Sequence, residues 1–290
     1  KQSYSRKILA TDVMTVKEFV KMYKSTRKKS FIEKYDDRKN PYSNFKNIDL
    51  TNIVIRKNIA YTEKLYQEFL KKRFSIVEIH NRPESLLYLL KKNISAKIIF
   101  TFHNNPKEMR GSTSIKERKY IAENTDQIYF VSKWVKDKFF EGLPYNHKNN
   151  CEIIYPAINP LRKFPKKEKL IIFCGKLNSS KGYDIFGKAI IKILNKYKDW
   201  KALAVGNEPR EKFSFNHKNF KILDWVQHKK ILNFYSKSSI SVVPSKWLEP
   251  FGRTAMESAA FGCATITSKK GGLPETFENS LFINKINEQE

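Results

Sequence analysis

Short apolar runs alternate with helical patterns from residue 75 onward in this 290-residue chain, and that alternation limits the fold more than any other feature. The predicted strands are Ser75–His80, Lys97–Phe102, Gln127–Val131, Glu152–Pro156, Leu170–Cys174, Ala202–Val205, Lys221–Leu223, Ile240–Val243 and Ala264–Thr267. The clearest helix is Asp184–Tyr197, because its apolar residues recur at 3.6-residue spacing. Strands that alternate with helices form parallel sheets covered by helices, so we predict an α/β fold.

A linker pattern divides the chain near Asn159–Lys169, where Pro160, Pro165 and a lysine-rich run interrupt the periodicity. We therefore predict two doubly wound, Rossmann-like domains that face each other across a cleft. Residues 1–165 would form an acceptor-side domain that lacks its first strand, and residues 166–290 a donor domain truncated at its C-terminus. Ligands of such sheets bind beyond the carboxyl ends of the strands. The loops expected to line the cleft begin at His80, His103, Gly175, Gly206, Pro244 and Ser268.

A formal net charge of +27 is the main peculiarity of the composition. One interpretation is a basic surface for an anionic partner, such as nucleic acid, a phosphorylated glycolipid or a membrane face. The other is the coding bias of an AT-rich genome, since Lys greatly outnumbers Arg. Nucleic acid is the weaker choice, because no helix-turn-helix, zinc-ligand or RNP-like pattern occurs. Thr15-x-x-Glu18 predicts the start of a basic helix, which either rests on an anionic membrane or packs one narrow face on the core.

The three cysteines, Cys151, Cys174 and Cys263, are far apart and form no C-x-x-C pair. Neither a disulfide framework nor a zinc site is indicated. Cys174 and Cys263 are expected to be buried thiols. No apolar run reaches the roughly 18–20 residues that a bilayer span requires. These features predict a cytoplasmic protein, with possible peripheral contact at the inner membrane face.

The segment Glu249-Pro-Phe-Gly-Arg-Thr-Ala-Met-Glu257 carries the strongest functional signal. It predicts a carboxylate in a turn, followed by a helix with a second carboxylate one turn in. Gly252 allows close backbone approach, and Thr254 offers a hydroxyl at the helix start. A helix N-terminus binds anions, and carboxylates accept hydrogen bonds from hydroxyl groups. The segment therefore suits a nucleotide-sugar, which has two phosphates, a ribose and a polyhydroxylated ring.

Two lysines flank the turn after the first strand of the second domain. Gly175 and Lys176 end this strand, while Lys181 precedes the long helix. Two cations five residues apart at a strand end can both reach a diphosphate. They would stabilise the negative charge of a departing nucleotide.

Two histidines end neighbouring strands of the first domain. His103 follows Lys97–Phe102 and is expected in the active site, and His80 ends the preceding strand in an equivalent position. Acceptor binding and loop bracing are both open for His80. Arg110, in the loop after His103, is interpreted as an ordinary exposed arginine rather than a phosphate ligand.

Residues 75–283 resemble retaining glycosyltransferases of the two-domain GT-B type, and more narrowly the family-4 enzymes that build lipopolysaccharide, capsule and other glycans. The resemblance rests on an ordered set of motifs. These are His80-Asn81-Arg82, Phe102-His103-Asn104, Val131-Ser132, Ile154–Asn159, Phe173-Cys174-Gly175-Lys176, Lys181-Gly182, Pro244-Ser245, Glu249-Pro250-Phe251-Gly252, Glu257 and Gly271-Gly272-Leu273-Pro274-Glu275.

This resemblance implies specific roles. Glu249 would bind hydroxyls of the donor sugar, Glu257 the ribose, and His103 would lie near the reacting carbon. The catalytic residues implied are His103 and Glu249; the donor-binding residues are Gly175, Lys176, Lys181, Glu249, Phe251, Gly252, Arg253, Thr254 and Glu257; the acceptor-binding residues are His80, Asn81, Arg82 and Asn104. The base would lie against Asp224–Val226.

The chain departs from the family pattern at two positions of the donor site. Lys176 stands where the family commonly has Arg, and Arg253 where an aliphatic residue is usual. Lys cannot make the bidentate contact that Arg makes with a diphosphate. Arg253 would supply a compensating cation.

The resulting hypothesis is a hexosyltransferase that moves a sugar from a UDP-, GDP- or ADP-sugar to a glycan or anionic glycolipid, with retention of configuration. We expect no metal and no other cofactor, because no D-x-D-like motif stands at a strand end. Lipopolysaccharide or other surface polysaccharide synthesis in a bacterium is the expected pathway. The alternatives are a non-catalytic nucleotide-sugar-binding protein, a GT-B-like epimerase and, less favoured, a basic nucleic-acid-binding protein.

Overall fold

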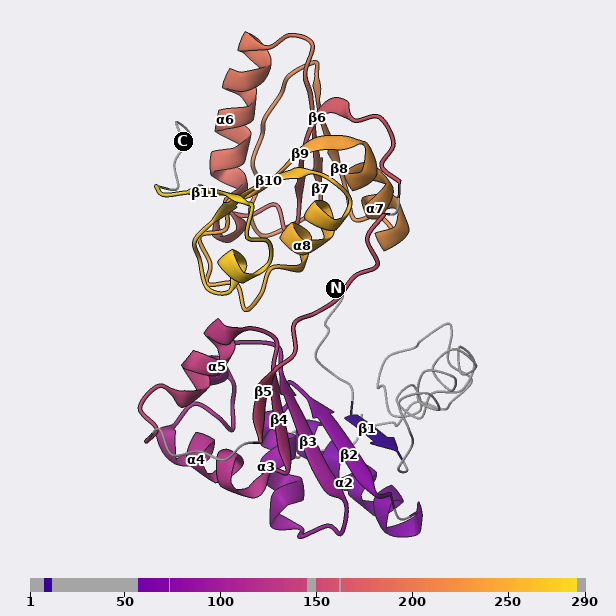
Figure 1. The fold of residues 1–290 in the computed structure, drawn as a ribbon, viewed down its shortest axis with the longest axis vertical. Coiled ribbons are helices and arrows are strands. Elements are labelled where there is room, and N and C mark those ends of the chain that lie inside the picture. The colour runs from indigo at the N-terminus through magenta and orange to yellow at the C-terminus, as the bar shows by residue number, and fades with distance from the viewer. Residues whose placement is uncertain (1–7, 12–56, 73, 145–149, 162, 286–290) are drawn as a thin grey trace. The chain divides into compact units, whose positions relative to one another are not determined.

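The computed structural model describes residues 8–11, 57–72, 74–144, 150–161 and 163–285. The chain forms two compact units, unit 1 (Lys1–Val131 and Val135–Ile154) and unit 2 (Ser132–Trp134 and Tyr155–Glu290). Figure 1 shows both units, which are described separately below. The predicted capping box at Thr15 and Glu18 lies outside the described residues.

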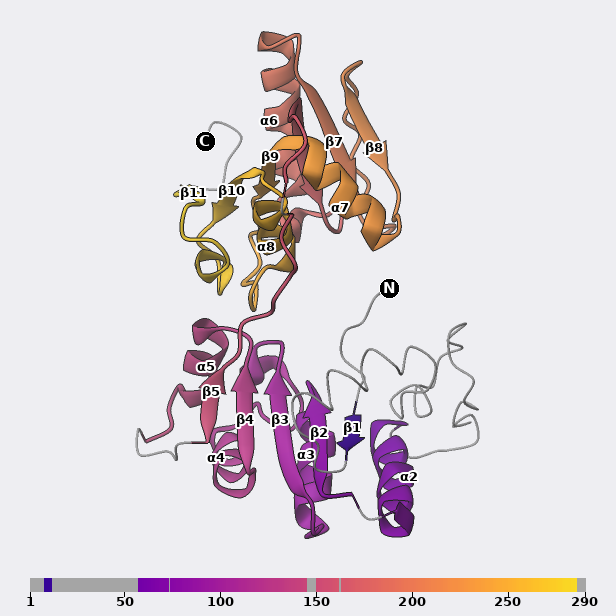
Figure 2. The same cartoon turned by 45° about the vertical axis from the view of Figure 1, so that its right-hand side comes forward.

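Unit 1 is a five-stranded sheet with the order β1-β2-β3-β4-β5. Its elements are β1 (Ile8–Thr11), α2 (Lys57–Lys72), β2 (Ile76–His80), α3 (Pro83–Lys91), β3 (Lys97–Phe102), η2 (Pro106–Glu108), α4 (Ile115–Asn124), β4 (Gln127–Phe130), α5 (Lys133–Phe140) and β5 (Cys151–Ile153). The first two residues of α5 are assigned to unit 2. The strands from β2 to β5 are parallel, and β1 is antiparallel to β2 at the edge (Figure 2). The antiparallel edge strand was not predicted.

The core of unit 1 follows from strand alternation. Val77 and Ile79 are buried in β2, whereas Ile76, Glu78 and His80 are half-buried. Helix α3 begins with Pro83 and contacts both α2 and α4. The rings of Phe102 and Phe130 stack on neighbouring strands at 5.6 Å between centroids. The buried face is therefore apolar and aromatic, while the other face of β2 carries Glu78 and His80 in addition to Ile76.

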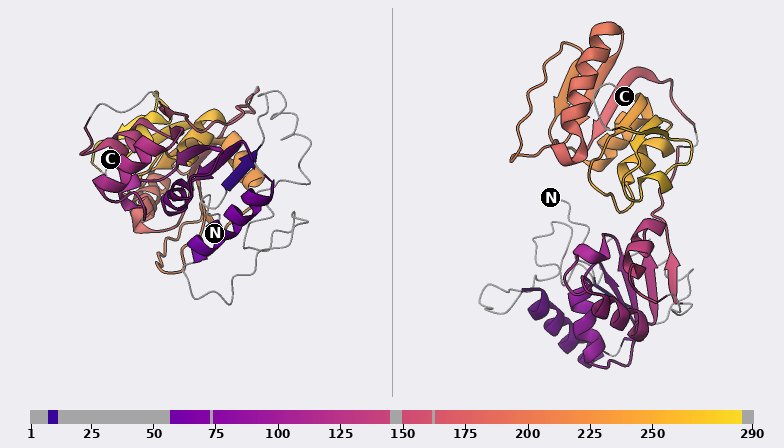
Figure 3. Two further views of the ribbon diagram at one scale, coloured as in Figure 1. Left: turned by 90° about the horizontal axis from the view of Figure 1, so that it is seen from below. Right: turned by 90° about the vertical axis from the view of Figure 1, so that its left-hand side faces the viewer.

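Unit 2 is a six-stranded sheet in which all pairs are parallel, with the order β11-β10-β9-β6-β7-β8. Its elements are β6 (Glu168–Cys174), η3 (Ser179–Lys181), α6 (Tyr183–Lys196), β7 (Lys201–Val205), β8 (Phe220–Leu223), α7 (His228–Lys237), β9 (Ser238–Val243), α8 (Arg253–Ala260), β10 (Ala264–Ser268), η4 (Leu273–Glu275) and β11 (Leu281–Ile283). The right-hand view of Figure 3 shows α6 running alongside strands of this sheet.

Helices cover both faces of this sheet because β6 is apolar on both sides. Ile171 and Phe173 pack with residues of α6, including Phe186, in one cluster. Ile172 and Cys174 belong to a second cluster, which includes Tyr235 of α7. Strand residues alternate between faces, so the two clusters lie on opposite sides of the sheet. A doubly wound sheet is the result, and the predicted α/β fold is confirmed.

The predicted elements agree with the observed ones apart from their ends. Every predicted strand overlaps an observed strand, and the predicted helix Asp184–Tyr197 is α6, shifted by one residue. The strand predicted at Glu152–Pro156 is shorter and begins earlier, as β5. Both Cys174 and Cys263 are buried free thiols, as predicted. Among the described residues, none of the helices is long and apolar enough to cross a bilayer.

Candidate functional site

The strand order of unit 2 reverses between β6 and β9. From β6 the sheet continues through β7 to β8 on one side, and from β9 through β10 to β11 on the other. In open parallel sheets the connections at such a switch point leave in opposite directions, and ligands bind in the crevice outside the carboxyl ends. The loop after β6 carries Lys176 and Lys181, while the loop after β9 carries Glu249. The predicted donor-binding residues therefore stand at the switch point of their own sheet.

Glycines allow the loops at this edge to approach one another. A Cβ atom at Gly206, after β7, would lie 1.7 Å from the carbonyl oxygen of Gly175, after β6. A Cβ atom at Gly182 would lie 2.1 Å from the carbonyl oxygen of Pro244, and Gly182 has a φ of 74°. Real side chains cannot occupy either space, so glycine is required at both positions.

Backbone hydrogen bonds hold the loop after β9 to the loop after β6. The carbonyl oxygen of Ser180 accepts from the amides of both Lys246 and Trp247 at 3.0 Å. Asn178 caps the short helix η3, because its side-chain oxygen accepts from the amide of Lys181 at 3.0 Å. The side chain of Lys181 is thereby directed from one loop toward the other.

Lys181 and Glu249 meet at this junction. The Lys181 Nζ atom donates to the Glu249 Oε1 atom at 2.5 Å and lies 4.3 Å from the ring centroid of Trp247. The two side chains are 24% and 12% exposed. Sequence analysis predicted both residues in the donor site, but it did not predict that they contact each other.

A second glycine pair fixes the backbone of Glu249. The Glu249 carbonyl oxygen accepts from the amide of Gly272 at 2.7 Å, and Glu249 forms a parallel bridge with Gly271. Gly271 has a φ of 65°, and a Cβ atom there would lie 2.2 Å from the same carbonyl oxygen. The Gly271-Gly272 motif therefore holds the backbone of Glu249 in position.

Gly252 is the N-cap residue of helix α8, and it has a φ of 108° and supplies no side-chain capping hydrogen bond. The first amides of a helix have no partner within the helix, and together with the helix dipole they favour an anion. Phe251 is buried next to this turn, and Arg253 and Thr254 are the first two residues of the helix. The predicted anion site at this helix end is compatible with the geometry.

Glu257 lies one turn into α8, and its side chain is 7% exposed. Its Oε1 atom accepts from the Arg253 Nη2 atom at 3.2 Å and lies 3.1 Å from the Nε2 atom of His228. His228 begins α7. Sequence reasoning assigned no role to His228, because its partner is 29 positions away and no motif joins the two.

Glu208 is a further buried acid that sequence analysis did not single out. Arg210 binds its two oxygens at 2.7 and 2.8 Å. The hydrogen bond from Arg210 lowers the pKa of Glu208 to about 2, and the charge of Lys176 acts in the same direction. Lys176, predicted to hold the diphosphate, therefore has an ionised acid in its neighbourhood.

In unit 1 the predicted acceptor-side residues gather at the ends of β2 and β3. The His80 Nδ1 and His103 Nε2 atoms are 2.9 Å apart. Asn81 has a φ of 56°, and its Oδ1 atom accepts from the amide of His103 at 3.1 Å. The side chain of Asn81 thus braces the loop that carries His103. Arg82 precedes α3, where its carbonyl oxygen accepts from the amide of Leu86, and Asn104 is exposed.

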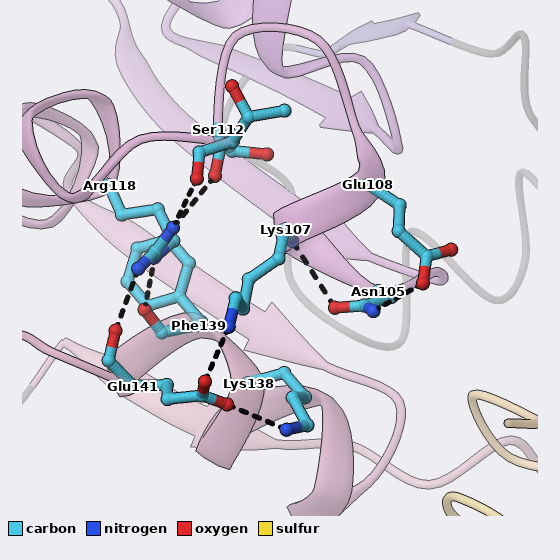
Figure 4. Close-up of polar contacts among 9 residues, drawn as sticks. Asn105, Lys107, Glu108, Ser112, Arg118, Lys138, Phe139 and Glu141 are labelled. Atoms are coloured by element: carbon cyan, nitrogen blue, oxygen red, sulfur yellow. Dashed lines mark hydrogen bonds and ion pairs between the residues drawn. The ribbon is translucent and has the colours of Figure 1, made fainter.

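A buried arginine orders the loop that follows His103 (Figure 4). The guanidinium of Arg118, which is 2% exposed, donates to the carbonyl oxygens of Phe139 at 2.8 Å, Thr113 at 2.8 Å and Glu141 at 2.7 Å. Buried carbonyl groups require such partners. Sequence analysis missed Arg118, because a lone arginine at the start of a helix resembles a solvated one. Arg110, as predicted, is largely exposed, and it pairs with Glu84 at 3.2 Å.

The structure thus divides the predicted residues into two sets. Unit 2 brings together the proposed donor-binding residues, and unit 1 the proposed acceptor-binding residues with His103. Their individual roles remain predictions, as do the base position at Asp224–Val226 and the absence of a metal requirement.

Comparison with known families matches both parts of the chain. Residues 157–288 match the model of "Glycosyl transferases group 1", and residues 36–162 match that of "Glycosyltransferase Family 4". The chain is 25% identical over 252 residues to spore coat protein SA of Bacillus subtilis, covering 75% of this chain and 66% of the relative. It is 31% identical over 210 residues to the uncharacterized glycosyltransferase MJ1178 of Methanocaldococcus jannaschii, covering 69% and 57%. The chain therefore spans less than two thirds of the length of these relatives.

Solved structures agree on the fold. A glycosyltransferase from Rickettsia africae superimposes with a TM-score of 0.63 at 21% identity, covering 84% of this chain and 73% of the other. Anabaena Alr3699/HepE, in complex with UDP-glucose, has a TM-score of 0.60 at 14% identity, covering 79% and 69%. The two family models, which together match residues 36–288, identify the chain as a member of the group 1 and family 4 glycosyltransferases, and the solved structures share its two-domain GT-B fold.

Proposed function

We propose that this chain transfers a sugar from a nucleotide-diphosphate donor to a glycan or glycolipid hydroxyl, with retention of anomeric configuration. The observation that carries the proposal is the contact between Lys181 and Glu249 at the switch point of unit 2. In this arrangement Lys181 would be the cation for phosphate and Glu249 the acid for sugar hydroxyls, and Glu249 shortly precedes Gly252, the N-cap of α8. Family membership supports the reaction class.

Donor binding would exchange partners within this site. The diphosphate takes the amides of the α8 N-terminus and the ammonium of Lys181, since both favour negative charge. Glu249 then loses its lysine partner and accepts from the sugar hydroxyls. Because Arg253 and His228 both contact Oε1 of Glu257, the other oxygen of that acid is the one available to the ribose. The donor is thus fixed at three separate points.

Retention follows from attack on the same face from which the nucleotide departs. The leaving phosphate takes the proton of the acceptor hydroxyl as the new glycosidic bond forms and the old one breaks. Lys181 and the α8 amides stabilise the charge on that phosphate, where preorganised donors lower the barrier most effectively. His103 would orient the reacting sugar from unit 1. This mechanism involves neither a separate enzymatic base nor a metal ion.

A UDP-sugar is the first donor to examine, because HepE, which shares the fold, has been crystallised with UDP-glucose and with UDP. The acceptor would be a growing surface polysaccharide such as lipopolysaccharide. In support, one relative is a protein of a cps region of Klebsiella pneumoniae, 30% identical over 179 residues. The excess of basic residues suits an anionic lipid carrier at the inner membrane face, reached from the cytoplasm.

The direct test is a transfer and hydrolysis assay with UDP-, GDP- and ADP-hexoses. The full-length protein would be given membrane lipids and glycan acceptors, and the anomeric configuration of the product would be determined by NMR. Nucleotide release with a product of the donor's own configuration supports the proposal. An inverted product contradicts the mechanism. Binding without turnover would favour a nucleotide-sugar-binding protein. Reversible conversion of the donor sugar into its epimer would favour an epimerase.

A further inference from the structure

Glu78, His80 and His103 lie on one face of the unit 1 sheet. Residues two apart in a strand point to the same side, so Glu78 and His80 share the half-buried face of β2. In the parallel register His80 is opposite Thr101. His103 follows Thr101 by two residues, just beyond the carboxyl end of β3. The topology therefore aligns an acid and two imidazoles toward the end of the sheet at which His103 lies.

The three side chains contact one another in series, with His80 between Glu78 and His103. The Glu78 Oε1 atom lies 3.0 Å from the His80 Nε2 atom, and the His80 Nδ1 atom lies 2.9 Å from the His103 Nε2 atom. The side chains of His80 and Glu78 are 22% and 28% exposed, so water partly screens the chain of contacts. Both ring nitrogens of His80 are thus engaged, one by a carboxylate and the other by an imidazole.

Ionised carboxylates can only accept hydrogen bonds, so Glu78 requires a proton on Nε2 of His80. A neutral His80 then has a bare Nδ1, which must accept. The proton in the second contact consequently belongs to Nε2 of His103, and the Nδ1 atom of a neutral His103 is an acceptor. We propose that Glu78 determines which ring nitrogen of His103 carries the proton, acting through His80.

Tyr129 is a further titratable group on this face of the sheet. Tyr129 of β4 is opposite Thr101 in the register. Burial raises the pKa of Tyr129, and the charges of Glu152 and Glu78 raise it further.

Glu78 and His80 are therefore positioning residues, and this role builds on the proposed function. With Nδ1 as acceptor, His103 would receive a hydrogen bond from a sugar hydroxyl rather than donate one. With a fixed tautomer, His103 does not have to change its protonation pattern when substrate binds. The proposed donor-binding residues belong to unit 2, so donor affinity should not depend on Glu78.

The test is NMR of the full chain labelled with ¹⁵N-histidine, at a pH where both imidazoles are neutral. Five histidines give few signals, and His80→Gln and His103→Gln assign the two of interest. We expect each ring to carry its proton on Nε2. A proton on Nδ1 of His103 would overturn the inference whether or not the protein has transferase activity.

Glu78→Leu and Glu78→Gln test the cause. Leu removes the acceptor, so the Nε2 proton of His80 should exchange with water faster and His103 should lose its single tautomer. Gln can still accept, so it should retain most of the wild-type pattern. Glu63→Gln, in α2, is the matched control because Glu63 pairs with Lys92 elsewhere in unit 1. Unchanged tautomers in Glu78→Leu, with thermal melting showing a folded protein, would overturn the proposed role.

Turnover provides an independent readout. Loss of one orienting hydrogen bond should lower kcat roughly fivefold in Glu78→Leu while the KM for donor stays constant. A change in the KM for donor with an unchanged kcat would contradict the inference. If the proposed transferase activity itself fails, the NMR result still decides the question of the tautomer.

Discussion

Each acid of the candidate donor site has a cationic partner drawn from another part of the sequence or from its own helix. Lys181 contacts Glu249 across 68 positions, and Arg253 and His228 contact Glu257. A phosphate ligand would compete for these cations, and sugar hydroxyls would take their place on the acids. The acids and cations of this site thus neutralise one another, and the site should respond to phosphate and hydroxyls together.

Buried thiols behind this site should make unit 2 sensitive to alkali. Burial raises the pKa of Cys174 to about 12 and that of Cys263 to about 11, from an ordinary value of 9.0. The unfolded chain therefore loses these protons first, and the native state binds more protons in this range. Stability should be fully present below pH 9 and decrease above it, by up to about 1.4 kcal/mol per pH unit for each thiol.

Thermal denaturation between pH 8 and pH 10.5 measures this effect. Cys174→Ala with Cys263→Ala should melt at a lower temperature at pH 8, because the cavities remain, but should lose less stability as the pH rises. Cys151→Ala should reduce the pH dependence of stability in the same way, because burial also raises the pKa of the Cys151 thiol in unit 1 to about 11. Equal pH slopes in the wild type and the double variant would contradict the assignment.

Residue types and spacing predicted the acids, lysines and strand-end histidines, but not the pairs they form. The distance of 2.9 Å between His80 and His103 depends on the register of β2 and β3, which sequence alone does not fix. Contacts such as His228 with Glu257 join distant loops, and no local pattern encodes them. Arg118 was missed for the same reason, since its acceptors are backbone carbonyls of a loop and of α5.

At the scale of elements, periodicity predicted strands β2 to β10 and helix α6, but not the 16-residue helix α2. Helix α6 and strand β6 were predicted because they bury a regular set of apolar residues. Strands β1 and β11 were not predicted, because β1 has four residues and β11 has three, which are too few to show a periodicity. Helix α4 begins with a capping box at Ser114 and Glu117, a signal that the sequence contains and that sequence analysis did not use.

The Gly271 turn offers a test of how elements position the site. Gly271→Ala should destabilise unit 2, because alanine would adopt a φ near 65° and its Cβ atom would approach the Glu249 carbonyl oxygen to 2.2 Å. Backbone strain of this kind costs about 1–3 kcal/mol. The shift of Glu249 should also weaken nucleotide-sugar binding. Thermal melting and isothermal titration of the same sample measure both effects.

Gly142→Ala is the matched control for this substitution. Gly142 has a φ of 82°, so alanine pays a similar backbone cost, but the nearest atom is a flexible Ile115 side-chain carbon at 3.0 Å. It should lower stability without affecting nucleotide-sugar binding. Full binding by a folded Gly271→Ala protein would show that the turn does not position Glu249.

At the scale of the whole molecule, the chain combines two parallel-sheet units with different site chemistry. Unit 2 supplies a helix terminus, a lysine and two acids, which suit a charged, polyhydroxylated ligand. Unit 1 supplies an acid and two imidazoles, which suit the orientation of a hydroxyl. The division into a donor part and an acceptor part was predicted from the linker and the motifs. The boundary predicted near residue 165 remains a prediction, as do the partner that explains the charge of +27 and the site of action in the cell.

Isothermal titration of UDP-glucose into the full chain, with Glu257→Gln and Glu278→Gln as variants, tests the central claim most directly. Glu278 is an exposed acid of the same unit and serves as the charge control. A charge-assisted hydrogen bond contributes about 1.5–3 kcal/mol, so Glu257→Gln should weaken binding by about tenfold or more. Glu278→Gln should bind as the wild type does. Equal affinity in all three proteins, or no binding of any nucleotide-sugar by the wild type, would contradict a donor site at the switch point of unit 2.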